Sequence, residues 1–278
     1  MIAAPLNPAR NGAPPTPLEP LGGDPLEYVS VSRLKTYLSC PLRFYFEKVL
    51  ALPKPVSPAL HFGRAVHAAL QAYNLARWRG GDVSEAAVVS AFGTAFATPE
   101  SVVDWGDAKP DELRVKGEAL VQAFLAAGVH ADAEKPMAVE ISVHAEHQDL
   151  ALPLLGVLDL VAADRRVTDY KTCASTPDPA AEAWLHEIQT TAYALLVEHA
   201  TELPGAGTDL VFLVKTKTPK IIVHGVPPPT QVQRDRFARL VEVYANGVAN
   251  ERYYPQPGMP CSWCQYRVEC SAWTGGGR

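Results

Sequence analysis

The sequence predicts a mixed α/β protein, in which a small mixed β-sheet is flanked by helices and follows a helical N-terminal region. Two patterns predict it. Residues 57–79, 84–97 and 110–127 place apolar side chains at helical spacing. From residue 137 onward the period shortens to two, as in strands, around one further helix at about 180–200. Runs of strands that enclose a helix indicate one compact α/β unit with helical insertions.

The ends of each element carry local signals. Ser30 or Ser32 can cap a first helix, which Cys40-Pro41 interrupts. Gly80-Gly81 and Gly128 are placed to end the helices before them. A last amphipathic helix is expected over residues 230–249. The predicted strands cover residues 137–147, 152–164, 166–172, 208–216 and 220–226.

Composition narrows the class of protein. The 278 residues carry a net charge of -5, which argues against bulk coating of nucleic acid or membrane but leaves room for a local basic channel. Residues 1–24 are rich in proline without the apolar core of a signal peptide, and we expect a disordered leader. Residues 25–278 are expected to form a single domain, with a helical insertion at about 82–128. No membrane span is expected, and the expected location is cytoplasmic.

The stretch GVLDLVAADRRVTDYKT contains two acids and a lysine on neighbouring strands. Asp169 and Lys171 are two apart and share a face. If residues 164–166 form the loop, Asp159 pairs with Lys171 and joins that face, whereas a one-residue slip would separate the acids. Carboxylates suit Mg²⁺ or Mn²⁺, and an ammonium can place a water. The plain alternative is solvated acids with a surface ion pair.

Two further helices carry candidate polar groups. His67, four residues after Gly63 and on the same helix face, is either a packed histidine or a further metal ligand. Gln189 and Tyr193 are spaced i, i+4 and could grip a phosphate or base, or simply pack.

The five cysteines are an odd number for disulfides, and three lie within ten residues as Cys261-x2-Cys264-x5-Cys270. This spacing favours an intracellular metal or cluster site that still needs a fourth ligand. Cys173, directly after the YKT strand, is interpreted as a small half-buried residue and not as a ligand.

These motifs together resemble the PD-(D/E)XK nuclease superfamily, and within it the iron–sulfur RecB-type exonucleases, such as the nuclease domain of AddB and a small CRISPR-adaptation nuclease. The resemblance covers about residues 30–271 and implies a restriction-endonuclease-like core. Its five pieces, in order, are SVSRLKTYLSCPLRFYF with Cys40, GRAVH with His67, GVLDL with Asp159, TDYKT with Asp169 and Lys171, and QTTAY with Gln189 and Tyr193.

The resemblance implies a role for each group. His67, Asp159 and Asp169 would hold Mg²⁺ or Mn²⁺, and Lys171 would be the catalytic lysine. The helix with Gln189 and Tyr193 is tied to DNA contact. The ligands of a 4Fe–4S cluster, which would join the two ends of the chain as a C-terminal clasp, would be Cys40, Cys261, Cys264 and Cys270. Spacing alone leaves zinc open. Glu140 lies where the family often has an acid.

We therefore expect a metal-dependent DNA exonuclease acting at single-stranded ends, in repair, recombination or CRISPR adaptation. The alternative is a non-catalytic iron–sulfur DNA-binding or adaptor subunit of a helicase or integrase complex. The expected partners are DNA and a helicase or integrase protein, and no membrane is expected. Two basic patches are expected to border the DNA groove: Arg33, Lys35, Arg43, Lys48 and Lys54 in the first, and Lys215, Lys217 and Lys220 in the second.

Overall fold

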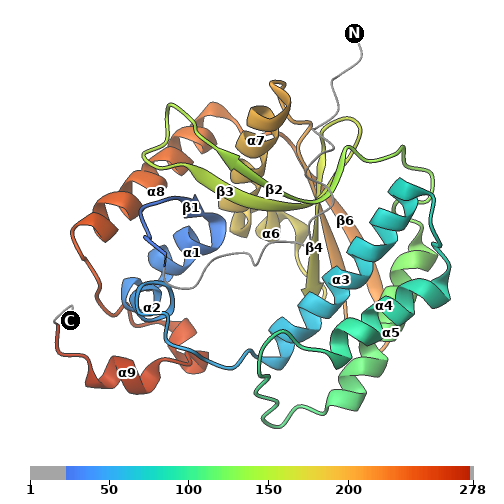
Figure 1. Cartoon of the computed structure of the whole chain (residues 1–278), viewed down its shortest axis with the longest axis horizontal. Helices are drawn as coiled ribbons and strands as arrows, with labels where there is room; N and C mark the ends of the chain where they lie inside the picture. Colours follow the sequence, from blue (N-terminus) through green and yellow to red (C-terminus); the bar gives the residue numbers. More distant parts are fainter. Residues whose placement is uncertain (1–22, 276–278) are drawn as a thin grey trace.

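The computed structural model describes residues 23–275, in which helices cover both faces of a six-stranded mixed sheet (Figure 1). The path along the sheet is β1-β3-β4-β5-β6, and β2 pairs with β3. Pairs β1–β3 and β4–β5 are parallel, and the other pairs are antiparallel. The strands are β1 (Val29–Ser30), β2 (Ala138–Ala145), β3 (Leu154–Val161), β4 (Val167–Cys173), β5 (Thr208–Val214) and β6 (Lys220–Val226).

Helices gather in two groups around this sheet. The N-terminal helices are α1 (Val31–Ser39), α2 (Pro41–Phe44) with the π-helical turn η2 (Tyr45–Val49), α3 (Pro58–Arg79), α4 (Glu85–Ala97) and α5 (Pro110–Ala127). The others are α6 (Pro179–Leu185), α7 (Glu187–Thr201), α8 (Gln231–Ala249), the 3-10 turn η3 (Met259–Trp263) and α9 (Arg267–Ala272). No helix within residues 23–275 is long and apolar enough to cross a membrane.

Each face of the sheet has its own apolar core. On one face α1, α7 and α8 pack around side chains such as Leu196 and Tyr244, both fully buried. On the other, α3, α4 and α5 enclose Phe62, Phe92 and Phe124. In Figure 1 these two helix groups stand on opposite sides of the central strands. The sheet is therefore covered by a layer of helices on each face.

The helix-end signals in the sequence act as expected. Ser57 caps α3 by accepting a hydrogen bond from the Leu60 N–H, and Ser30 caps α1 in the same way. Gly80 and Gly128 follow α3 and α5 with φ of 71° and 62°, the left-handed conformation that ends a helix. Thr230 starts α8 with a full capping box.

Two expectations about local structure were wrong, and one lies largely outside the described residues. The single helix expected at 180–200 is two helices, because His186 leaves the helical conformation between α6 and α7. The hairpin pairs Val161 with Val167, not residue 163 with 167, because the Ala162 N–H donates to the Arg166 carbonyl and the three-residue loop is 163–165 and not 164–166. The proline-rich leader, residues 1–24, falls on residues 1–22 that the structure does not describe.

Candidate active site

Asp159 lies at an opening in the sheet. One edge of β3 pairs with β1 at Leu154 and Leu155 and with β4 at Leu160 and Val161, so residues 156–159 lie between the two partners. The Tyr170 N–H, on β4, donates to Asp159 Oδ2 at 3.1 Å in place of a strand carbonyl. Because β4 separates from β3 at this point, the Asp159 carboxylate accepts the hydrogen bond that a backbone carbonyl of β3 would otherwise accept from Tyr170.

The observed register changes which residue lies across from Asp159. Leu160 faces Thr168, so Asp159 stands opposite Asp169 and not opposite Lys171. The observed register differs from the expected one by two residues. Because side chains alternate between the two faces of a strand with a period of two, Asp159 and Asp169 still project from the same face of the hairpin.

His67 approaches Asp159 from α3. Its Nδ1 lies 3.4 Å from Asp159 Oδ2, and its Nε2 lies 2.8 Å from the Tyr170 carbonyl oxygen. A carbonyl only accepts, so Nε2 carries a proton and Nδ1 is the nitrogen that faces the carboxylate. This is the arrangement of metal-ligating histidines, whose second ring N–H is fixed by a backbone carbonyl.

A second set of contacts holds Asp169. Its Oδ1 accepts from the Tyr193 hydroxyl at 2.8 Å and from Gln189 Nε2 at 3.0 Å. Its Oδ2 lies 2.8 Å from Lys171 Nζ but accepts no aligned hydrogen bond from any described residue. Gln189 Oε1 in turn accepts from Lys171 Nζ at 2.9 Å. Asp169 is 2% exposed, so this network fixes a buried carboxylate beside an ammonium.

The charges around Asp159 are strongly coupled. Burial alone would raise the pKa of Asp159, but His67 and the Tyr170 N–H lower it below its ordinary value. Burial would lower the pKa of His67, and Asp159 outweighs this and raises it to about 9. Burial, followed by the charge of Asp159, raises the pKa of Glu140 to about 7. Three titratable groups therefore share one field, which is frequent at functional sites.

Glu140 has an unusual backbone. Its φ is 48° within β2, a conformation that costs a non-glycine residue energy. Its neighbours Val139 and Ile141 pair with Leu160 and Leu158, so Glu140 stands opposite Asp159 on the adjacent strand. Strain in an acidic residue that faces a buried acid indicates a constrained site and not ordinary strand packing.

The residues present suit a divalent cation, although the ligand set is not closed. Within residues 23–275 no three His, Cys, Asp or Glu side chains are already grouped to hold a metal ion. Yet Asp169 Oδ2 is a buried carboxylate oxygen without an aligned hydrogen bond, and His67 turns Nδ1 to Asp159. Hard oxygen donors with one imidazole are a set that Mg²⁺ or Mn²⁺ accepts.

Three further residues lie near Lys171: His186 and Glu182, which sequence reasoning did not single out, and Lys35, which it assigned only to the first basic patch. His186 Nδ1 is 3.2 Å from Gln189 Oε1, and its Nε2 is 3.3 Å from Glu182 Oε2. Lys35 lies close enough for Lys171 and Asp169 to act on its charge, and burial followed by Lys171 lowers its pKa. The spacing of His186 three residues before Gln189, one helical turn, was the available signal.

The first basic patch is mostly occupied by internal contacts. Arg33 is 3% exposed and bonds the Tyr28 carbonyl, so it is a core residue and its expected place at a DNA groove is wrong. Arg43 pairs with Glu47, and Lys54 with Glu269. The second patch differs: Lys215 and Lys217 line a pocket of about 460 Å³ with Lys116 of α5.

The four predicted cluster cysteines share one region of the structure. Cys40, Cys264 and Cys270 pack against an apolar cluster of Leu42, Tyr45, Phe46 and Tyr266. Burial, followed by the charges of Cys40, Cys264 and Cys261, raises the pKa of Cys270, so all four thiols are within electrostatic reach. All are free thiols. Cys173 is half-buried on β4, apart from this cluster.

Further contacts fix the C-terminal segment to the N-terminal one. Lys54 Nζ lies 2.6 Å from Glu269, Gln265 Nε2 donates to the Pro55 carbonyl, and the Tyr266 hydroxyl donates to the Leu52 carbonyl. These contacts join residues 52–55 to residues 265–269.

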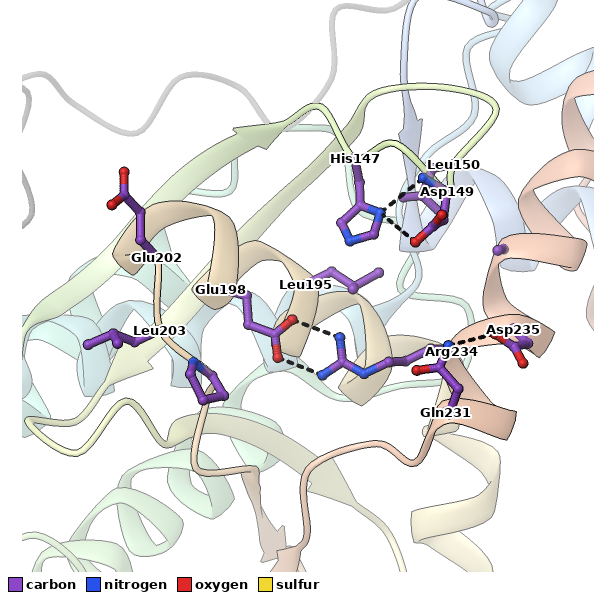
Figure 2. Close-up of a pocket in the computed structure, with 12 residues that line it drawn as sticks. His147, Asp149, Leu150, Leu195, Glu198, Glu202, Leu203, Gln231, Arg234 and Asp235 are labelled. Atoms are coloured by element: carbon purple, nitrogen blue, oxygen red, sulfur yellow. Dashed lines mark hydrogen bonds and ion pairs between the residues drawn. The ribbon is translucent and has the colours of Figure 1, made fainter.

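A pocket of about 520 Å³ lies elsewhere, between α7, α8 and the loop after β2 (Figure 2). Figure 2 shows Arg234 in a two-bond ion pair with Glu198, and His147 beside Asp149. None of the predicted catalytic residues lines it. Because its arginine is already neutralised, we assign the chemistry to the opening at Asp159 and not to this pocket.

Comparisons with known proteins identify the fold and the superfamily of the chain. A provisionally named exonuclease from Eubacterium rectale aligns with a TM-score of 0.59 at 16% identity, covering 87% of this chain and 88% of its own, which shows a shared fold. The structure of SSO0001 aligns at 15% identity over 87% and 93%, with a TM-score of 0.37 that carries no argument. No curated protein sequence matches significantly. The family model described as the PD-(D/E)XK nuclease superfamily matches residues 28–271, and the chain belongs to that superfamily.

Proposed function

We propose that this nuclease is a metal-dependent DNA exonuclease that hydrolyses phosphodiester bonds at single-stranded ends. The observation that carries the proposal is the buried Asp169 carboxylate, paired with Lys171 at 2.8 Å and opposite an Asp159 that faces His67. The name of the Eubacterium rectale structure supports the exonuclease class. Repair, recombination or CRISPR adaptation as the pathway, and a helicase or integrase as partner, remain predictions.

The roles follow from the contacts. When bound, Mg²⁺ or Mn²⁺ would polarise the phosphodiester and lower the pKa of a water. Asp159, Asp169 and His67 would hold it. Lys171, oriented by the Gln189 carbonyl oxygen, carries a positive charge to the place where negative charge develops on phosphate. Gln189 and Tyr193 keep the Asp169 carboxylate in one orientation, so we assign them a positioning role beside the predicted contact with DNA.

A cleavage assay tests the proposal. End-labelled linear and circular DNA, single- and double-stranded, is incubated with Mn²⁺, Mg²⁺ or EDTA. We expect cleavage of linear single strands only with a metal ion, and loss of cleavage in Lys171→Ala with folding and cysteine-site metal unchanged. Lys109→Ala, which removes an exposed lysine paired with Glu112, is the matched control and should cleave normally. An undiminished rate in Lys171→Ala would remove the assignment.

We further propose a 4Fe–4S cluster on Cys40, Cys261, Cys264 and Cys270. Cys40, Cys264 and Cys270 pack on one apolar cluster, which supports the proposal, although no three ligands within residues 23–275 are already grouped for a metal; the family resemblance favours iron over zinc. Its role would be structural, since hydrolysis needs no electron transfer. Anaerobically purified protein should be brown and contain iron. Cys264→Ala should lose it, while Cys173→Ala should keep it; colourless protein with zinc and no iron contradicts the cluster.

A further inference from the structure

Helix α6 leaves two large apolar side chains in solvent beside the candidate active site. None of its seven residues is buried, and Trp184 and Leu185 are 67% and 61% exposed. A single exposed apolar residue is ordinary, so exposure alone says little. The position of Trp184 and the contacts of its ring are what distinguish it.

The helix borders the reactive groups directly. It follows β4, which carries Asp169 and Lys171, and ends at His186, whose Nδ1 lies 3.2 Å from Gln189 Oε1. Glu182 of α6 acts on the charge of Lys35 in α1, together with Lys171 of β4. Figure 1 accordingly shows α6 between α1 and β4. Trp184 is therefore two residues from a side chain that touches the Lys171 network.

The Trp184 ring makes a cation–π contact. The Arg236 guanidinium of α8 lies over it, 5.3 Å from the ring centroid, and also pairs with the Glu187 carboxylate of α7. A guanidinium fixed by a carboxylate gives the indole a preferred orientation while two thirds of its surface stay open. An aromatic ring oriented in this way is suited to receive a second flat group.

We propose that Trp184 is a stacking platform for a nucleobase of the strand being cleaved, an inference that rests on the proposed function. The ring also lies two residues before His186, whose side chain contacts the Gln189 amide that orients Lys171, so a base on the indole would belong to a strand that passes the reactive groups. Base–aromatic stacking is available to any base, so the platform is independent of sequence. Because duplex bases are already stacked on one another, an unpaired base gains more, which gives a preference for single strands.

Binding and cleavage are measured separately to test this. Full-length protein in EDTA is titrated with a fluorescent single-stranded DNA oligonucleotide and with the same oligonucleotide carrying one abasic site, which is moved along it. Trp184→Ala should raise the Kd about 5-fold or more for intact DNA, the effect of ~1 kcal/mol of stacking. Trp184→Phe should recover part of the affinity. At one abasic position the wild type should bind as weakly as Trp184→Ala, and the slope of log Kd against log salt should not change.

Trp263→Ala is the matched control, since Trp263 is 64% exposed on the C-terminal segment. It should retain wild-type affinity. Equal losses in the two variants, or an unchanged Kd in Trp184→Ala, would overturn the platform. So would a Trp184 effect that is the same at every abasic position, because no single base would then meet the indole. If Trp184→Ala weakens binding but the wild type cleaves nothing with any metal, the nuclease proposal fails and the platform stands.

Discussion

Replacing Tyr193 by Phe removes one hydroxyl from the Asp169 network and little else. The hydroxyl donates to Asp169 Oδ1 at 2.8 Å and accepts from Gln189 Nε2 at 2.6 Å. Tyr193 is 5% exposed, and its ring packs in the core formed by α1, α7 and α8. Phenylalanine keeps that ring, so the change creates no large cavity and isolates the hydrogen bonds.

The expected cost follows from the charge of the acceptor. A hydrogen bond to a charged group contributes ~1.5–3 kcal/mol, against ~1 kcal/mol for a neutral acceptor. Tyr37 offers the matched comparison, because it is also 5% exposed and its hydroxyl donates to a neutral acceptor, the Arg252 carbonyl, at 3.2 Å. We expect Tyr193→Phe to lower the free energy of unfolding by ~2 kcal/mol and Tyr37→Phe by ~1 kcal/mol.

Urea unfolding at pH 7 in EDTA, followed by circular dichroism, measures both losses under the same conditions. Cleavage by the refolded variants is then assayed with Mn²⁺, and Tyr193→Phe alone should slow it, because the carboxylate loses one of the two groups that orient its Oδ1. A loss in Tyr193→Phe equal to or below that in Tyr37→Phe would refute the reasoning, since Asp169 would then not be held as a charged acceptor.

Two predictions concern pH. Burial, followed by the charge of Arg77, lowers the pKa of His130 to about 4, so its neutral form stabilises the fold above pH 6.5 and this contribution, up to ~3 kcal/mol, is lost as pH falls towards 4. His130→Gln should flatten the fall of stability between pH 7 and 4, and an identical fall would contradict the assignment. Glu140 has a pKa of about 7, so its protonated form contributes fully to the free energy of unfolding below pH 4.5. This contribution declines as the pH rises through 7. In EDTA, Glu140→Gln should therefore be more stable than wild type by ~1–3 kcal/mol at pH 8.5 and equal at pH 4.5, and no difference at pH 8.5 would refute the burial of its charge.

Local signals predicted most of the elements. The capping serine at position 57, the glycines at 80 and 128 and the alternation in β2 to β6 each depend on a few neighbouring residues, which sequence displays directly. The break at His186 was missed because the apolar pattern continues through it. The hairpin register was missed because loop closure at Ala162 and Arg166 depends on backbone geometry that no residue type specified.

The sequence predicted which polar residues come together, but not the contacts they make, and their catalytic roles stay predictions. The motif spacing selected Asp159, Asp169, Lys171 and His67, and the structure brings Asp159 to His67 and Asp169 to Lys171. The positive φ of Glu140 arises from its pairing with β3, and the approach of Lys35 to Lys171 joins segments more than a hundred residues apart; periodicity encodes neither. Arg33 shows the converse, since a charge that looked exposed is buried under Tyr28.

The contacts between the N-terminal and C-terminal segments affect how the protein folds during translation. Tyr266 reaches Leu52 across 214 residues, and Tyr37 reaches Arg252 across 215. During translation, the aromatic side chains of Tyr45 and Phe46 leave the ribosome long before Tyr266, which covers them. Such contacts close late, and apolar surface stays open to other chains meanwhile. We expect the nascent protein to depend on chaperones until the segment with Tyr266 emerges, and a stop codon near residue 255 to yield aggregates and not a shorter nuclease, which the soluble fraction after expression would show.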